Sequence, residues 1–211
     1  MKQRNIKVNI HIALTFVNIY FKILSGDIML FSYKEIKNKL KSDYQIKKAI
    51  EDNSIYKIDD GLYSDKKVVN PLEVISKKYP DAIFTLQTAF YLYDLTDVIP
   101  DIFYLATARN VTRIKDKNIK QVFVSNNLFS FGKTQIEVEN IKVNIYDKER
   151  LLIELIRKKN VLPFDYYKEI IHNFRKEADN LDMFKIQEYI SYYKNEVSLY
   201  NSLMQEVFWL I

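Results

Sequence analysis

Residues 32–63, SYKEIKNKLKSDYQIKKAIEDNSIYKIDDGLY, decide the fold of the N-terminal part of the chain. Ser32 and Glu35 form a capping box, in which the serine hydroxyl and the glutamate carboxylate close the start of a helix. The apolar residues that follow have helical spacing, so this pattern predicts a helix that runs to about Leu40.

A second helix and a hairpin are expected directly after the first helix. Ser42-Asp43 provides a break and a second N-cap, which predict a helix over residues 44–52. Residues 55–58 and 62–63 are β-prone and flank Asp59-Asp60-Gly61, a strong hairpin signal because glycine readily takes positive φ. Two short helices followed by a small hairpin describe a winged helix-turn-helix, which binds duplex DNA.

Each predicted helix has an apolar face and a cationic face. Tyr33, Ile36 and Leu40 are expected to pack inward from the first helix, and Ile46, Ala49 and Ile50 from the second. Residues 33–48 carry six lysines against two acidic residues. This charge indicates a polyanion partner, although a small helical domain with solvated lysines remains the alternative.

Composition excludes several classes of function. The chain has 211 residues, 48% of them apolar, and a formal charge of +5, which suits one domain or two small ones. It has no cysteine, so disulfides, thiolate metal sites and cysteine nucleophiles are excluded, and a cytoplasmic location is expected. His11 and His172 lie far apart, and Asn127 stands where a P-loop ending in Gly132-Lys133-Thr134 would need another glycine. We expect no metal, no cofactor and no catalytic site.

Residues 1–28 are interpreted as a leader outside the folded domains. Polar residues interrupt its apolar stretch, so we expect no membrane span, and no A-x-A pattern supports a signal peptide. Gly26-Asp27-Ile28-Met29 could be encoded by GGA-GAU-AUA-AUG, which places a ribosome-binding sequence just before an AUG. On this hypothesis residues 1–28 are untranslated upstream sequence and translation starts at Met29.

The remaining chain predicts two domains, a winged helix-turn-helix over residues 29–78 and a mixed α/β domain over residues 79–211. The fold class is therefore α+β, with a small sheet and a helical C-terminal part in the second domain. Strands are expected at residues 102–106, 121–124, 134–138 and 142–146. Helices are expected at residues 71–78, 86–95, 166–178, 183–194 and 197–209, with another that Asp147 caps.

Several blocks of the sequence resemble the AbiEi family, bacterial transcriptional regulators that serve as antitoxins in type IV toxin-antitoxin (abortive infection) pairs. The resemblance extends over about residues 29–208, and the blocks that carry it are YKIDDGLY (56–63), YPDAIFTLQTA (79–89), LTDVIP (95–100), IFYLATAR (102–109) and VNIYDKERLLIE (143–154). One departure is Asp94, which stands where the family more often has glycine.

The resemblance implies a repressor that binds inverted repeats in its own promoter through the N-terminal winged helix. It also implies that the protein counters a nucleotidyltransferase-like toxin encoded nearby without necessarily forming a stable complex. The alternative is an antitoxin that acts by direct contact with its toxin through the C-terminal domain. Nucleotidyltransferase activity of the chain itself is disfavoured, because no Gly-Ser is followed by a D-x-D carboxylate pair.

The candidate DNA-binding residues follow from the geometry of a winged helix. Residues at the start of its second helix approach base edges, while lysines around it contact phosphates. We expect base contacts from Tyr44, Gln45 and Lys48, and phosphate contacts from Lys34, Lys37, Lys47 and Lys57. A second basic patch, which either extends the DNA footprint or protects a sheet edge from aggregation, comprises Arg109, Arg113, Lys115, Lys117 and Lys120.

Two further clusters have a structural interpretation and a functional one. The tyrosines at 166–167 and 189–193 could stack on single-stranded nucleic acid, but their helical spacing favours core packing. Glu177, Asp179 and Asp182 invite a metal site, but they straddle a predicted helix break and are interpreted as caps and solvated charge.

Overall fold

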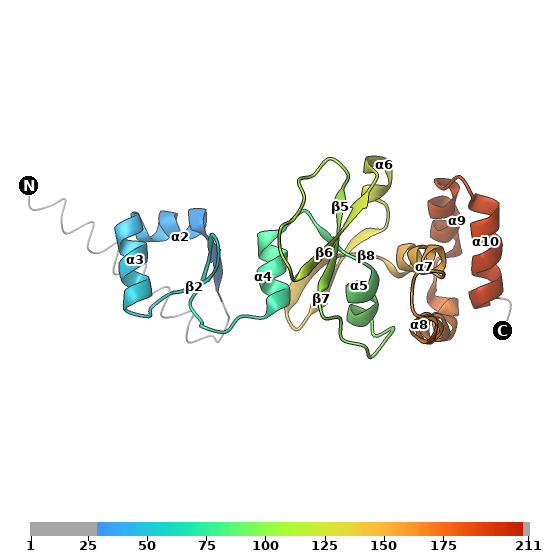
Figure 1. Cartoon of the computed structure of the whole chain (residues 1–211), viewed down its shortest axis with the longest axis horizontal. Coiled ribbons are helices and arrows are strands. Elements are labelled where there is room, and N and C mark those ends of the chain that lie inside the picture. Colours follow the sequence, from blue (N-terminus) through green and yellow to red (C-terminus); the bar gives the residue numbers. More distant parts are fainter. Residues whose placement is uncertain (1–28, 209–211) are drawn as a thin grey trace, which may run out of the picture. The chain divides into compact units, whose positions relative to one another are not determined.

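The computed structural model describes residues 29–208 (Figure 1). The leader expected at residues 1–28 lies outside the described residues, as do residues 209–211. The chain divides into two compact units, Met1–Tyr79 and Pro80–Ile211. Within the described range there are nine α-helices and two small sheets, so the expected mixture of helices and sheets is confirmed.

The first unit consists of short elements around a three-stranded antiparallel sheet of order β1-β3-β2. Its elements are β1 (Leu30–Ser32), α2 (Tyr33–Leu40), α3 (Asp43–Glu51), β2 (Tyr56–Asp59), β3 (Leu62–Ser64) and α4 (Pro71–Lys78). The two expected helices, the hairpin and the helix beginning at Pro71 are all present.

Side-chain caps explain where these helices begin. Ser32 and Glu35 make the expected capping box, with the Ser32 backbone N–H donating to Glu35 Oε2 at 2.7 Å. Ser42 Oγ accepts from the backbone N–H of Gln45 at 3.2 Å and caps α3. Asn70 caps α4, whose first residue is a proline.

A small apolar core holds α2 and α3 against the sheet. Its buried members are Phe31, Ile36, Ile46, Ala49, Ile55 and Tyr63. Leu40 and Ile50 are partly buried against this cluster, as expected. The expectation that Tyr33 packs inward is wrong, because its side chain is 41% exposed and its hydroxyl bonds a charged residue instead.

The second unit contains a mixed five-stranded sheet of order β6-β5-β4-β8-β7. Its strands are β4 (Ile83–Phe84), β5 (Phe103–Ala108), β6 (Ile119–Val124), β7 (Lys133–Val138) and β8 (Ile141–Tyr146). β4 pairs antiparallel with β5 and parallel with β8, and β5 pairs parallel with β6. β7 and β8 form the expected hairpin, in which Glu139 and Asn140 both take positive φ.

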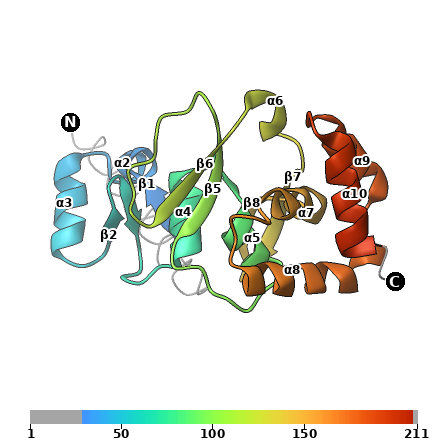
Figure 2. The same cartoon turned by 45° about the vertical axis from the view of Figure 1, so that its right-hand side comes forward.

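Helices of the second unit pack on this sheet and on one another. They are α5 (Leu86–Leu92), α6 (Asn126–Phe129), α7 (Lys148–Arg157), α8 (Phe164–Lys176), α9 (Met183–Ser191) and α10 (Glu196–Leu203), with single turns at Ala178–Asn180 and Met204–Phe208. α7 lies between the sheet and the pair α9 and α10 in both views (Figures 1 and 2). Because other elements surround α7, even its Glu149 and Arg150 are buried.

Several element boundaries differ from expectation. α5 ends at Leu92 rather than Leu95, because Asp94 adopts a left-handed φ of 57° that ends the helix. α8 begins at Phe164 rather than Tyr166, so Asp165 lies in its first turn. α10 ends at Leu203, and a π-helical turn continues the chain to Phe208. The short elements β1, β4 and α6 were not expected.

Candidate nucleic-acid interface

A tight turn joins α2 to α3. Lys41 ends α2 in the left-handed region at φ 70°, and its backbone N–H donates to the Lys37 carbonyl at 2.8 Å. Ser42 then begins α3 at once. The two helices therefore follow each other with only two residues between them.

A polar triad of Tyr33, Lys37 and Asp43 bridges this turn on its outer side. The Tyr33 hydroxyl donates to Asp43 Oδ1 at 2.6 Å, and Lys37 Nζ lies 2.8 Å from that hydroxyl and 3.1 Å from Asp43 Oδ2. The hydrogen bonds from Tyr33 and Lys37 hold the pKa of Asp43 below its usual range. The triad thus connects the first turns of α2 to the N-terminus of α3.

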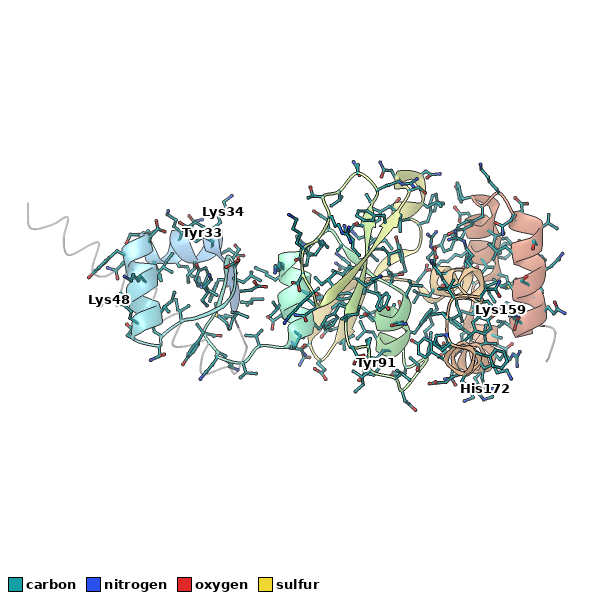
Figure 3. The ribbon with its side chains drawn as sticks, viewed as in Figure 1. Tyr33, Lys34, Lys48, Tyr91, Lys159 and His172 are labelled. Atoms are coloured by element: carbon teal, nitrogen blue, oxygen red, sulfur yellow. The ribbon has the colours of Figure 1, made fainter. Side chains whose placement is uncertain are left out.

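The outer face of α3 carries the residues predicted to contact bases. Tyr44 is 72% exposed, and Gln45, Lys47 and Lys48 are exposed beside it. Only Ile46 and Ala49 of this helix are buried. Lys48 projects from α3 and Lys34 from α2 (Figure 3). The structure therefore places these predicted residues on the surface of one compact unit.

The lysines predicted to contact phosphates differ in how closely they pair with other residues of the protein. Lys37 belongs to the triad, and Lys57 Nζ pairs with Asp60 Oδ1 at 2.8 Å. Lys47 approaches Glu51 only to 3.9 Å, with its side chain 78% exposed. Exposed pairs of this kind are weak and are screened by solvent and salt, so they do not prevent a contact with phosphate.

The β2–β3 hairpin is fixed to the start of α2. Gly61 turns the hairpin at φ 73°, and its carbonyl accepts from the backbone N–H of Tyr33 at 2.7 Å. This bond also satisfies one of the free N–H groups at the helix start. The hairpin that carries Lys57 is thereby held next to α2.

Two ion pairs attach α4 to the same unit. Lys77 Nζ lies 2.8 Å from Glu35 Oε1, and Lys78 Nζ lies 2.6 Å from Asp59 Oδ2. The hydrogen bond from Lys77 lowers the pKa of Glu35 to about 2. Neither ion pair nor the triad was predicted from the sequence, since only the i, i+4 spacing of Tyr33 and Lys37 gave a local signal.

The second basic patch lies on the loop between β5 and β6, in the other unit. Arg109, Arg113, Lys115 and Lys117 are exposed on this loop, and Lys120 is exposed on β6, an edge strand. Gln121 holds the loop closed, because it accepts from the Ile114 backbone N–H at 2.7 Å and donates to Thr107 Oγ1 at 2.8 Å. The patch is therefore placed at the sheet edge, where it is compatible with both of its expected roles.

Several members of the tyrosine and carboxylate clusters have structural roles. Tyr167, Tyr189 and Tyr193 are buried, which confirms core packing for these three. Asp182 caps α9, and Glu177 pairs with Lys148.

Among residues 29–208, no helix is long and apolar enough to cross a membrane. The same residues contain no group of three or more His, Asp or Glu side chains that could hold a metal ion.

No protein-family model matches the chain, and no curated protein matches it in sequence. The functional assignment therefore rests on the residues and on their arrangement.

Proposed function

We propose that the first unit is a winged helix-turn-helix and that the protein is the DNA-binding repressor and antitoxin of a type IV toxin-antitoxin system. In this proposal it acts in the cytoplasm, binds inverted repeats in its own promoter and has no catalysis or cofactor of its own. α3 enters the major groove of duplex DNA, and the β2–β3 hairpin lies along the sugar-phosphate backbone of the DNA.

The exposed outer face of α3 is the observation that carries the proposal. Tyr44, Gln45 and Lys48 project from a helix that the core and the polar triad hold in place. An exposed recognition surface on a firmly held helix is what major-groove reading requires.

Two features outside α3 support the same proposal. β1 precedes α2 and pairs with β3, which gives the order strand, helix, helix, strand, strand around one small sheet. Asp94 takes a φ of 57°, a conformation that favours glycine, at the position where the AbiEi family more often has glycine.

The residues divide into two roles. Gln45 can pair with adenine through two hydrogen bonds, and Lys48 can reach the acceptors of guanine. Tyr44 lies in the first turn of α3 beside Gln45. The phosphate contacts are assigned to Lys34, Lys37, Lys47 and Lys57, which position the protein without reading sequence.

Fluorescence anisotropy tests the proposal directly. The protein starting at Met29 is titrated into its own upstream DNA and into a scrambled duplex of the same length, across a salt series. We expect the upstream DNA to bind at least about 10³-fold more tightly than the scrambled duplex. Equal and weak binding to both would contradict a sequence-specific repressor.

Two substitutions separate the phosphate and base roles. Lys47→Ala should weaken binding to both duplexes and lower the salt slope by about 1, whereas Gln45→Ala should relax specificity at one base pair. Lys194→Ala is the matched control, because Lys194 is also exposed but lies in the second unit. An unchanged salt slope for Lys47→Ala would remove its phosphate role.

The same assay decides between the two roles of the second patch. A double variant, Arg113→Ala with Lys117→Ala, removes two exposed cations from the β5–β6 loop. Weaker binding to both duplexes would assign the loop to the DNA footprint. Unchanged binding together with increased aggregation would assign it to protection of the β6 edge.

Direct contact with the toxin is the second candidate for the antitoxin activity. Exposed apolar side chains on the C-terminal helices favour it, namely Phe164 at 64%, Phe184 at 85% and Val197 at 70%. Co-expression with the nucleotidyltransferase-like toxin encoded nearby distinguishes the two mechanisms. A repressor that acts through DNA alone does not co-purify with the toxin, whereas a stable complex that Phe184→Glu disrupts would establish direct contact.

A further inference from the structure

A cavity of about 310 Å³ lies in the second unit beside helix α7 and the end of edge strand β6. Its walls come from segments that are far apart in the sequence, including β6, α6, α7 and the start of α5. Four cationic residues line it against a single carboxylate, Glu154, and they are Arg109, Arg150, Arg157 and Lys158.

Arg150 is the most deeply buried of these cations. Its side chain is 1% exposed, and its guanidinium lies 5.2 Å from the ring centre of Tyr146 and 5.6 Å from that of Tyr193. Nη2 pairs with Glu154 Oε1 at 3.0 Å, but Nε and Nη1 have no hydrogen-bond partner within the described part of the chain. A buried charge with unpaired donors is costly, so its retention points to an anion nearby.

Glu154 cannot neutralise this cluster alone. Besides Arg150, it accepts from Arg157 Nη1 at 3.2 Å and from the Tyr193 hydroxyl at 3.2 Å. The side chains of Arg109 and Lys158 make no ion pair with any residue from 29 to 208. The lining therefore has an excess of three positive charges in a partly enclosed space, where electrostatic attraction is stronger than in bulk water.

Besides the charged residues, the wall includes the hydroxyl residues Thr85 and Ser125, several apolar side chains and an aromatic ring. Val122, Val124 and Leu128 line the cavity, and the Phe123 side chain beside them is 46% exposed. An exposed aromatic ring next to cations is the combination on which nucleic-acid bases stack. The cavity volume lies at the lower end of the range for small-molecule sites.

We propose that this cavity binds a nucleoside phosphate of mononucleotide size. The phosphate lies among Arg109, Arg157 and Lys158, where it compensates the charge of buried Arg150, and the base lies against Phe123. The proposal uses no residue of the first unit and does not depend on promoter binding, so either proposal can fail without the other.

Isothermal titration calorimetry on the full chain tests the site. The probes are AMP, GMP, CMP and UMP, with the unphosphorylated nucleosides and inorganic phosphate as comparisons. We expect at least one mononucleotide to bind with a dissociation constant below about 100 µM. The matching nucleoside and inorganic phosphate should each bind at least about tenfold more weakly, since each lacks one of the two recognised groups.

A matched pair of double variants locates the binding. Arg109→Gln with Lys158→Gln removes two lining cations that make no ion pair with a described residue, so the fold should be retained. Arg113→Gln with Lys115→Gln makes the same change in charge at exposed positions that do not line the cavity. We expect at least a tenfold loss of affinity for the first pair and less than a twofold loss for the second.

Phe123→Ala independently tests whether the base lies against Phe123. It should weaken mononucleotide binding several-fold while leaving inorganic phosphate binding unchanged. The proposal is overturned if no mononucleotide binds saturably up to about 5 mM, far weaker than typical specific ligands. It is also overturned if inorganic phosphate binds as well as the nucleotide, or if both double variants lose affinity equally.

Discussion

Gly132 lies where neighbouring atoms leave no room for a side chain. It has a φ of 69°, and a Cβ added there would lie 2.6 Å from Arg150 Cβ and 2.7 Å from Asp147 Oδ1. Its carbonyl accepts at 2.7 Å from the backbone N–H of Asp147, which is the N-cap residue of α7. One residue thus fixes the approach of β7 to the helix that carries Arg150 and Glu154.

Gly132→Ala is therefore expected to destabilise the second unit by about 2–4 kcal/mol, from backbone strain and from the displacement of α7. Thermal unfolding monitored by circular dichroism measures the effect. Gly61→Ala is the matched control, because Gly61 has a φ of 73° but nothing within 4 Å of an added Cβ. An equal loss in both variants would mean that the contact with Arg150 carries no cost.

Glu35 makes the stability of the first unit depend on pH in the acidic range. Its pKa is lowered from the ordinary 4.5 to about 2, mainly by the hydrogen bond from Lys77 and then by the Ser32 backbone. A carboxylate with a lowered pKa contributes stability above its unfolded pKa, and that stability is lost as the pH falls from about 4.5 through 2.

We expect Glu35→Gln to destabilise the first unit at pH 7 by about 1 kcal/mol or less, because the side chain is about half exposed. The difference from the wild type should vanish near pH 2. Urea unfolding at pH 7, 4 and 2, followed by NMR signals of residues 29–79, measures it. A difference that is the same at all three pH values would exclude the ionised carboxylate as its source.

At the scale of elements, the helices and the hairpin that depend on local contacts were predicted correctly from local sequence signals. Ser32, Ser42 and Gly61 predicted two helix starts and a hairpin correctly, because each acts on residues within a few positions of itself. β4 was missed, since its two residues are strand only through pairing with β5 and β8. Tyr33 was misplaced because helical spacing identifies a face but not the polar partner, Asp43, that lies on the next helix.

The difference between local and long-range contacts also explains which of the two sites could be predicted from the sequence. The exposed residues of α3 follow one another in the sequence, so their shared surface could be inferred from periodicity. The cavity is lined by residues from Thr85 to Lys158, and no local pattern brings them together. The one available signal was Arg150-Leu151-Leu152-Ile153. Its three consecutive apolar residues point to different sides of the helix, which indicates that this turn and its arginine are buried.

Ser42→Ala is expected to loosen α3 without unfolding the core. Ser42 Oγ is the acceptor for the Gln45 N–H, and loss of such a cap costs about 1 kcal/mol. Amide hydrogen exchange should become faster across Asp43–Glu51, while Ser42→Asp, which keeps an acceptor, should retain protection. Unchanged exchange in the alanine variant would show that the triad alone holds the helix start.

At the scale of the whole molecule, each unit contains its own sheet and its own buried residues. Residues 29–79 and 80–211 are therefore expected to fold when produced separately. Two-dimensional NMR spectra of the two fragments should overlay on the spectrum of the longer chain, except near Tyr79 and Pro80. A fragment that gives a collapsed, poorly dispersed spectrum would show that the division does not mark an independent folding unit.

Six residues other than glycine take positive φ among those described, against two glycines, and they include Lys41, Asp94, Glu139 and Asn140. Every glycine codon begins with GG, whereas lysine and asparagine codons begin with AA and those of aspartate and glutamate with GA. Asp94 and Glu139 are thus each one A-to-G transition from glycine, the residue best suited to their backbone. Each of these two single-nucleotide changes is therefore expected to relieve backbone strain worth up to about 1 kcal/mol.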